Sequence, residues 1–258
     1  MNQRRILVTG SSRGIGKAIA ETLAQQGVTV ICVSKSAESC GATAAAIIAA
    51  GGKAKALAVD VADGAAIAKA SEELLKEFPA IDILVNNAGT AESAPLHRSD
   101  TALFERMIAM HLMAPVHASK AVLPSMLERG AGHIVNVASV AGLMGAPYVT
   151  AYSSAKHAMI GLTRSLALEL GPRGVAVNAV CPAYTDTDLV TGAVERIVQR
   201  TGRSASDALQ SILSDAGQSR IVTSEEVADA VLALCNAPPG AAVGQTVVID
   251  GRTAETGS

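Results

Sequence analysis

The chain has 258 residues and a mass of 26.1 kDa, which is enough for one large α/β domain or two small ones. Hydrophobic residues make up 49% and charged residues 17%, so the composition excludes a disordered chain. The formal net charge is -2, and the aromatic residues are three Tyr, two Phe and no Trp. This leaves neither a basic surface nor enough rings for nucleic-acid binding.

The apolar runs and the cysteines indicate the cellular compartment of the protein. No apolar run approaches the roughly 20 residues of a membrane-spanning helix, so no membrane segment is expected. Cys32, Cys40, Cys181 and Cys235 show neither CxxC spacing nor partner histidines at zinc-ligand intervals. We therefore expect buried, reduced cysteines, no metal site, and a soluble cytoplasmic protein.

Short runs rich in Val and Ile alternate with longer Ala-rich helical stretches. This alternation predicts one doubly wound parallel sheet of about seven strands, a Rossmann-type α/β fold with helices on both faces. No linker divides residues 1–258, so one domain is expected, and the long strandless stretch at about 186–220 is predicted to be an active-site lid. Strands are predicted at 5–9, 28–33, 55–59, 81–86, 133–138, 175–180 and 246–250, and helices at about 14–26, 37–50, 63–78, 100–129, 151–170 and 224–236.

The first strand leads directly into a glycine-rich turn that precedes a helix. Glycines at 10, 14 and 16 allow a tight turn and let the backbone approach a pyrophosphate at the helix start. The spacing departs from GxGxxG. It also misses the P-loop pattern, because Ser11 stands in place of the first glycine and Ala18 in place of the magnesium-binding hydroxyl residue. The turn disfavours a nucleoside triphosphate, and by itself it fits a simple strand-to-helix connection as well as a dinucleotide site.

This turn, Thr9-Gly10-xxx-Gly14-Ile15-Gly16, resembles the nucleotide-binding signature of the short-chain dehydrogenase/reductase family. Further matches follow in the family's order over residues 5 to about 251, and the pattern is most similar to 3-oxoacyl-thioester reductases and polyketide ketoreductases. These further matches are Asp60-Val61, Asn86-Asn87-Ala88-Gly89, Ser139, Tyr152-Ser153-Ser154-Ala155-Lys156 and Pro182-Ala183-Tyr184-Thr185-Asp186-Thr187, with Ala183 where the family usually has Gly.

The resemblance implies a single NADP-binding oxidoreductase domain that interconverts a ketone and a secondary alcohol by hydride transfer. It also assigns the cofactor-binding positions. These are Gly10, Ser12, Arg13, Gly14, Ile15, Gly16, Ser34, Lys35, Asp60, Val61, Asn87, Ala88, Gly89, Tyr152, Lys156, Pro182, Ala183, Thr185 and Thr187.

The end of the second strand bears on the choice between NAD and NADP. An acid there would bind the adenosine ribose hydroxyls and repel a 2′-phosphate. This chain instead has Ser34 and Lys35, and Arg13 stands in the glycine turn. Either cation alone could be an ordinary surface residue. Both together, with no acid, favour NADP(H).

Tyr152 and Lys156 lie four residues apart, so they share one helix face, and Ser139 ends the fifth strand. A free tyrosine titrates near 10, and a nearby ammonium would favour its ionised form. The resemblance assigns the same roles. Tyr152 gives a proton to the carbonyl oxygen, Ser139 binds that oxygen, and Lys156 binds the nicotinamide ribose and lowers the Tyr152 pKa.

One catalytic position departs from the family. Its members use an Asn on the helix after strand four, and this chain reads Met110-His111-Leu112. His111 either replaces that Asn in a proton relay, which would add a titration between about pH 5.5 and 7.5, or fills space. All three tyrosines lie within 148–184, so Tyr148 and Tyr184 are candidate substrate contacts, with simple packing as the alternative.

The sequence leaves the substrate class open between several alternatives. We expect a 3-oxoacyl thioester, carried by ACP or CoA, or a similar β-keto compound. A cyclic, aromatic or steroid-like ketone is the alternative, and a non-catalytic NADP-binding sensor is a distant one. Helices 100–129 and 151–170 carry apolar residues on more than one face, and related enzymes are commonly tetramers built on them. A homotetramer is therefore expected.

Overall fold

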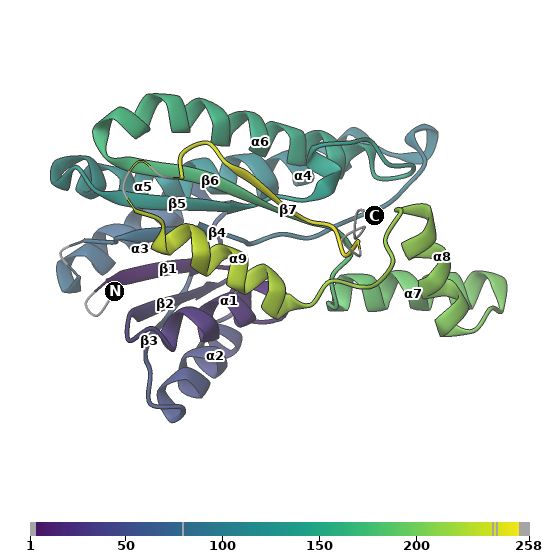
Figure 1. The fold of residues 1–258 in the computed structure, drawn as a ribbon, viewed down its shortest axis with the longest axis horizontal. Coiled ribbons are helices and arrows are strands. Elements are labelled where there is room, and N and C mark those ends of the chain that lie inside the picture. Colours follow the sequence, from purple (N-terminus) through teal and green to yellow (C-terminus); the bar gives the residue numbers. More distant parts are fainter. Residues whose placement is uncertain (1–3, 79, 239, 241, 253–258) are drawn as a thin grey trace, which may run out of the picture.

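The structure is a computed structural model that describes residues 4–78, 80–238, 240 and 242–252, so both ends of the predicted domain lie outside the described part. Within these residues, seven parallel strands form one sheet in the order β3-β2-β1-β4-β5-β6-β7 (Figure 1). The predicted doubly wound fold is confirmed. The strands are β1 (Arg5–Thr9), β2 (Thr29–Ser34), β3 (Lys53–Ala58), β4 (Ile83–Asn86), β5 (Gly132–Val137), β6 (Val175–Pro182) and β7 (Thr246–Ile249).

Helices cover both faces of the sheet, which explains the continuous apolar runs. In β1, Ile6 and Val8 point to one face and Leu7 to the other, and all three are buried. Helices α1 (Gly14–Ala24), α2 (Ala37–Ala49) and α9 (Ser224–Asn236) pack on the Ile6 face. Helices α3 (Gly64–Glu77), α5 (Ala114–Arg129) and α6 (Thr150–Leu170) pack on the Leu7 face. Lys53 and Lys55 lie on the edge strand β3, where charge discourages pairing with another sheet.

The helix predicted over 100–129 is interrupted. It consists of α4 (Thr101–Ile108), a π-helical turn at Ala109–Met113 and α5. Pro115, in the first turn of α5, has no N–H to donate to the carbonyl of His111, so regular α-helical bonding cannot continue through this point. Short 3-10 turns occur at Leu96–Arg98, Val140–Gly142 and Gly171–Arg173.

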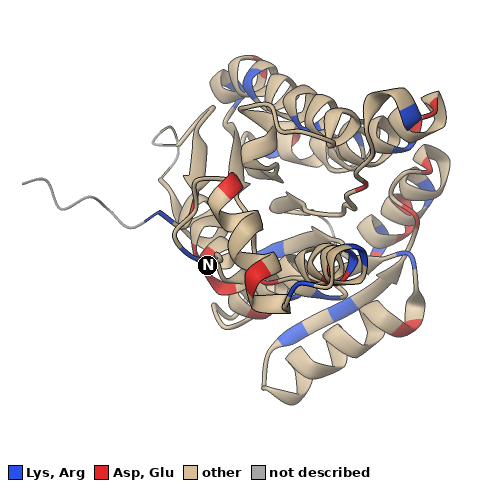
Figure 2. Cartoon of the chain, turned by 90° about the vertical axis from the view of Figure 1, so that its right-hand side faces the viewer, with Lys and Arg blue, Asp and Glu red and all other residues tan. Residues whose placement is uncertain are grey.

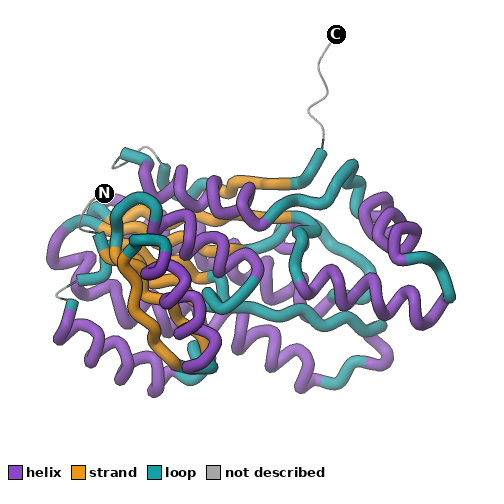
Figure 3. The backbone as a smooth tube through the Cα atoms, turned by 90° about the horizontal axis from the view of Figure 1, so that it is seen from below, coloured by secondary structure: helices purple, strands orange, loops and turns teal. Residues whose placement is uncertain are grey.

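The predicted excursion at 186–220 contains α7 (Asp188–Thr201) and α8 (Ala205–Asp215), which project beyond the strand ends (Figures 1 and 3). The view onto this side shows basic and acidic residues interspersed (Figure 2). The base of the excursion is closed by a bridge between Thr185 and Val222. Among the helices of the described residues, none has the length and apolarity needed to span a bilayer.

Candidate active site

The turn between β1 and α1 forms a backbone cradle. Gly10 has a φ of +66°, and a Cβ atom there would lie 2.6 Å from the Cα of Ala88. Gly14 has a φ of +51° and faces the methyl group of Thr187. Helix α1 starts without a side-chain cap and without an acidic residue in its first turn. The turn, with Ser12 and Ile15 also on it, therefore presents main-chain N–H groups suited to an anion.

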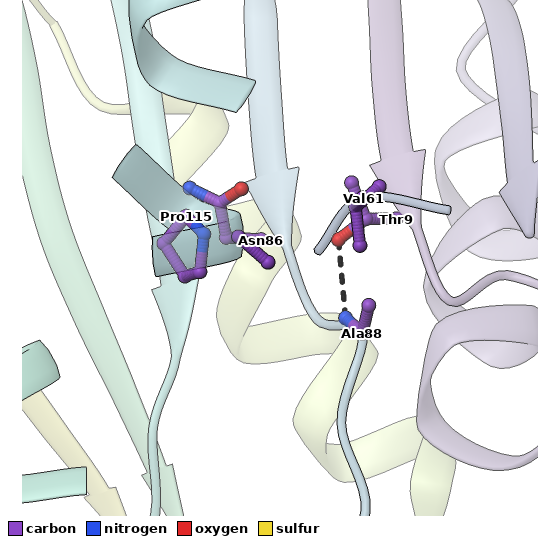
Figure 4. Close-up of a pocket in the computed structure, with 6 residues that line it drawn as sticks. Thr9, Val61, Asn86, Ala88 and Pro115 are labelled. Atoms are coloured by element: carbon purple, nitrogen blue, oxygen red, sulfur yellow. Dashed lines mark hydrogen bonds between the residues drawn. The ribbon is translucent and has the colours of Figure 1, made fainter. Parts of the chain in front are cut away.

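The carboxyl ends of β1 and β4 are tied together beside this turn. The Thr9 hydroxyl oxygen accepts a hydrogen bond from the main-chain N–H group of Asn87 at 2.9 Å. It accepts a second one from the N–H group of Ala88 at 3.1 Å (Figure 4). The Asn87 side chain donates to the Gly10 carbonyl at 3.2 Å. Thr9, Val61 and Ala88 line a narrow pocket between the strand ends. The predicted positions 61, 87 and 88 are thus brought against the glycine turn.

Both cations predicted to bind a 2′-phosphate are paired with carboxylates. Lys35 Nζ lies 2.9 Å from Asp60 Oδ2, and Arg13 Nη1 lies 2.9 Å from Asp188 Oδ2. The hydrogen bond from Lys35 is the main cause of the lowered pKa of Asp60. Ser34 donates to the carbonyl of Ser36. The two cations are mostly exposed, and exposed ion pairs contribute only about 0–1 kcal/mol to the free energy of unfolding. An incoming phosphate can therefore displace the two carboxylates from Arg13 and Lys35.

The segment after β6 leads from the sheet to the glycine turn. β6 ends at Pro182, and the Ala183 N–H donates to the carbonyl of Ile249 at 2.9 Å. The Thr185 hydroxyl donates to the Ala183 carbonyl at 3.0 Å, and Thr187 reaches Gly14. Alanine at position 183 is therefore compatible with this conformation.

Ser139, Tyr152 and Lys156 meet at the carboxyl edge of the sheet. Ser139 follows β5, and its side-chain oxygen accepts a hydrogen bond from the Ala141 N–H at 3.1 Å. Tyr152 and Lys156 lie one turn apart on α6, with Lys156 Nζ 5.7 Å from the centre of the Tyr152 ring. The Lys156 ammonium donates to the Val137 carbonyl at 2.8 Å. The predicted triad is therefore assembled from two separate segments, the end of β5 and helix α6.

Burial dominates the electrostatics of this triad. It raises the pKa of Tyr152 to about 12, and a hydrogen bond with the Ser139 side chain only partly opposes the rise. Burial also lowers the pKa of Lys156 to about 7. In the ligand-free chain the net shift of the Tyr152 pKa is upward, because desolvation of the phenol is the largest contribution. At neutral pH Tyr152 holds its proton and can donate it.

Because the pKa of Lys156 is lowered in the folded chain, the free energy of unfolding is predicted to depend on pH. Unfolded Lys titrates near 10.5, so between about pH 7 and 10.5 the unfolded chain binds a proton that the folded chain has released. The free energy of unfolding should therefore rise with pH above about 7, relative to Lys156→Met, which has no proton to lose. Urea unfolding at pH 6, 7, 8 and 8.5 measures this difference. Lys120→Met, at an exposed position on α5, is the control, and parallel curves for wild type and Lys156→Met would contradict the prediction.

The other two tyrosines lie on loops at the same edge. Tyr148 has a φ of +66°, a conformation rare for residues other than glycine, and its side chain is 64% exposed. Tyr184 is 40% exposed. Its main chain is held at both ends by the buried Gln218 side chain, which accepts from the Tyr184 N–H at 2.9 Å and donates to its carbonyl at 3.2 Å. Both tyrosines are available to a substrate.

A family model described as short chain dehydrogenase matches residues 4–197. The chain belongs to the short-chain dehydrogenase family. It is an oxidoreductase of this family, acting on alcohol or ketone groups. The matched stretch includes the glycine cradle, Ser139, Tyr152 and Lys156.

Three relatives illustrate the range of the family. A 3-oxoacyl-[acyl-carrier-protein] reductase of Synechocystis sp. is 39% identical, over 95% of this chain and 94% of its own length. The cis-4-hydroxycyclohexanecarboxylate dehydrogenase of Sinomonas cyclohexanicum is 36% identical, over 96% of each chain. The crystal structure of a point variant of the actinorhodin polyketide ketoreductase with NADPH superposes with a TM-score of 0.91 at 30% identity, over 97% of this chain and 98% of that one.

His111, at the position of the family's Asn, lies in the π-helical turn and is 1% exposed. Its Nε2 is 2.7 Å from the Thr90 carbonyl oxygen, and its ring meets the Tyr152 ring edge-on, with centroids 5.1 Å apart. Burial and the nearby Lys156 lower the pKa of His111 to about 3. This disfavours the relay alternative, which needs a titration between pH 5.5 and 7.5, because the imidazole is already neutral throughout that window.

Several contacts in this family site could not be predicted from side-chain types. The carbonyls of Val137 and Thr90 hold Lys156 and His111, and a carbonyl is present at every residue. Gln218 lies 34 residues from the tyrosine whose main chain it holds. Asp188 begins α7, and its pairing with Arg13 depends on the fold.

Proposed function

We propose that the protein is an NADP(H)-dependent ketoreductase for a 3-oxoacyl thioester, carried by ACP or CoA, or a similar β-keto substrate. One observation carries the proposal. The Ser139 and Tyr152 side chains lie close enough for Ser139 to lower the Tyr152 pKa, and with the buried Lys156 they share the strand edge that also holds the glycine cradle. A protonated phenol next to a second hydroxyl is suited to receive a developing alkoxide.

The cradle fits a dinucleotide. Gly10 and Gly16 leave no room for side chains, Gly14 has a left-handed backbone conformation, and the uncapped start of α1 presents N–H groups to a pyrophosphate. Arg13 and Lys35 stand where a 2′-phosphate would be held, and Ser34 replaces the acid that would select NAD. In the neighbouring polyketide ketoreductase the bound cofactor is NADPH. These points support NADP(H) for this chain.

The residues divide the remaining work. When bound, NADPH supplies the hydride that the carbonyl carbon accepts. The Tyr152 hydroxyl donates its proton to the carbonyl oxygen, and a water or relay must return that proton before the next turnover. Ser139 holds the carbonyl oxygen in line with Tyr152. Lys156 is held by the Val137 carbonyl and lies next to the Tyr152 ring, where it binds the nicotinamide ribose.

Exposed apolar residues around the site support an acyl substrate. Met144 and Tyr148 lie on the loop that follows Ser139, and Tyr184 and Leu189 lie on the segment that follows β6. Both segments leave the same edge of the sheet, so they offer apolar surface to a chain attached to the ketone. We propose Tyr148 and Tyr184, with Ser139 and Tyr152, as substrate contacts.

A cyclic ketone is the second candidate. The cyclohexane-carboxylate dehydrogenase relative is 36% identical, close to the 39% of the acyl-carrier reductase, so similarity does not separate the two classes. A non-catalytic sensor is disfavoured, because binding alone gives no reason for a buried lysine beside two paired hydroxyls.

The test is a panel of reductions followed by NADPH absorbance. It compares acetoacetyl thioesters, β-ketoesters, cyclic ketones and aryl ketones at equal concentrations. The proposal expects the thioesters to give the highest kcat/KM. A preference for cyclic ketones would select the second candidate, and no turnover of any ketone would support a sensor.

We propose that residues 186–220 act as a substrate lid. Only Val190 of α7, and Ala208 and Leu213 of α8, are buried among the residues of these helices, so little apolar contact holds them down. The base is pinned by Gln218 and by the bridge from Thr185. The moving part would therefore be 187–217.

Limited trypsin digestion tests the lid. Arg196, Arg200 and Arg203 should be the first cleavage sites, and NADPH together with an alcohol product should slow their cleavage. The fragments are identified by mass. First cleavage outside 187–217, with this stretch resistant, would count against a lid.

We also propose a homotetramer working in the cytoplasm. In the single chain, Leu168 of α6 is 82% exposed, and Met113 at the π-helical turn is also exposed, which supports association through these helices. All four cysteines lie within the described residues and are free and buried, which suits a reducing compartment. Light scattering at micromolar concentration should give four times the chain mass, and a monomer mass would refute the assembly.

A further inference from the structure

The hydrogen bonds of His111 fix its tautomer. Its Nε2 lies 2.7 Å from the Thr90 carbonyl oxygen, and a carbonyl oxygen can only accept, so Nε2 carries the hydrogen. In a neutral ring the lone pair is then on Nδ1. Burial and the positive charge of Lys156 both disfavour a second proton. His111 is therefore a neutral ring with one donor already used and one acceptor.

That acceptor is buried and has no hydrogen-bond partner among the described residues. A buried acceptor without a partner is costly, and native structures rarely retain one without a function. The other such ring nitrogens in the described residues, on His117 and His133, lie away from the triad on α5 and β5. The Nδ1 atom of His111 is distinguished by its surroundings.

Two neighbours define where Nδ1 is. The Tyr152 ring lies perpendicular to the His111 ring, with centroids 5.1 Å apart. On the other side, a Cβ atom at position 89 would lie 2.7 Å from Cε1 and 3.3 Å from Nδ1, so only glycine leaves that edge of the imidazole open. Gly89 is also among the positions assigned to the cofactor. Nδ1 is thus an acceptor beside Gly89, on a ring that also packs against the Tyr152 ring.

The backbone at this point supports a functional role. His111 lies in the π-helical turn, and such turns occur frequently at functional sites because they displace one residue from the helix surface. Pro115 maintains the turn by withholding an N–H. The distortion thus brings the ring against Tyr152.

We propose that His111 is a positioning residue whose Nδ1 accepts a hydrogen bond from an O–H group beside Tyr152 and Gly89, and that it does not itself carry protons. The O–H group is either a water molecule or a hydroxyl of the bound cofactor. The inference rests on the proposed function only in placing the site in a reductase. It differs from a proton relay through the imidazole, because the ring keeps one protonation state throughout turnover.

The first test is nitrogen NMR of the full protein labelled with ¹⁵N-histidine, with the His111 signals identified from their loss in His111→Asn. The expected result is a protonated Nε2 and an unprotonated, hydrogen-bonded Nδ1 that does not titrate between pH 5.5 and 8. A hydrogen-bonded shift in the protein alone identifies a water, and one that develops only with NADP⁺ identifies a cofactor hydroxyl. A non-hydrogen-bonded Nδ1 in both states, or a protonated one, would overturn the proposal. This readout needs no turnover, so it stands even if the substrate class is wrong.

The second test compares three variants with the best ketone of the panel. His111→Asn keeps a donor and an acceptor and should retain kcat within about threefold, with a pH profile parallel to wild type. His111→Leu loses both and should lower kcat about tenfold, with NADPH affinity and Tm measured alongside. His97→Leu, at an exposed position, is the control. A wild-type kcat in His111→Leu would leave only a space-filling role, and a titration lost in His111→Asn would show proton transfer by the ring.

Discussion

Tyr152→Phe is expected to lower kcat for ketone reduction by at least about 100-fold, which is the scale of a lost general acid. The substitution keeps the ring, and with it the edge contact to His111, and removes only the hydroxyl that is hydrogen-bonded to Ser139. Because burial holds the Tyr152 pKa near 12, the phenol is protonated over the whole working range and is the available acid.

The measurement is single-turnover NADPH oxidation with the best ketone, together with NADPH affinity from its fluorescence. NADPH affinity should change little, since the glycine cradle and Lys156 are intact. Ser154→Ala removes a hydroxyl from an exposed residue of the same helix that has no assigned role, and it is the control. A kcat above one tenth of wild type in Tyr152→Phe would show that the proton comes from another group.

Lys35→Asp is expected to lower kcat/KM for NADPH about 10- to 100-fold and to leave kcat/KM for NADH unchanged or improved. A hydrogen bond to a charged group contributes about 1.5–3 kcal/mol, and the substitution both removes it and adds a charge of the same sign as the phosphate. The preference should also weaken with salt, because the site is exposed. Equal kcat/KM for both cofactors in the wild-type protein would contradict the assignment.

Asp188→Asn is the companion variant for this prediction. It removes the carboxylate that pairs with Arg13 at 2.9 Å and leaves both cations in place. Arg13 then binds the 2′-phosphate without first breaking an ion pair. The KM for NADPH should therefore fall by a few fold, while the KM for NADH stays the same. A matching change for both cofactors would mean that Asp188 acts through the lid and not through the 2′-phosphate.

The fold could be predicted because its determinants are local. Parallel strands covered on both faces need continuous runs such as Ile6-Leu7-Val8, and the helices between them need an apolar stripe, so order and alternation are readable along the chain. The glycine turn and the Tyr152–Lys156 spacing are also local, since a tight turn and a shared helix face involve neighbouring residues. Family resemblance supplied the roles that spacing could not.

The sequence by itself therefore determined the sheet, the nucleotide turn, the triad and the residue types available to a phosphate. Only the tertiary structure decided how those groups behave. Burial sets the pKa values of Tyr152 and Lys156 and keeps His111 neutral. Segments far apart in the sequence pair Arg13 with Asp188 and Gln218 with Tyr184. The physical reason is that desolvation and long-range pairing depend on what surrounds a side chain in space, and a single sequence without the fold does not specify those neighbours.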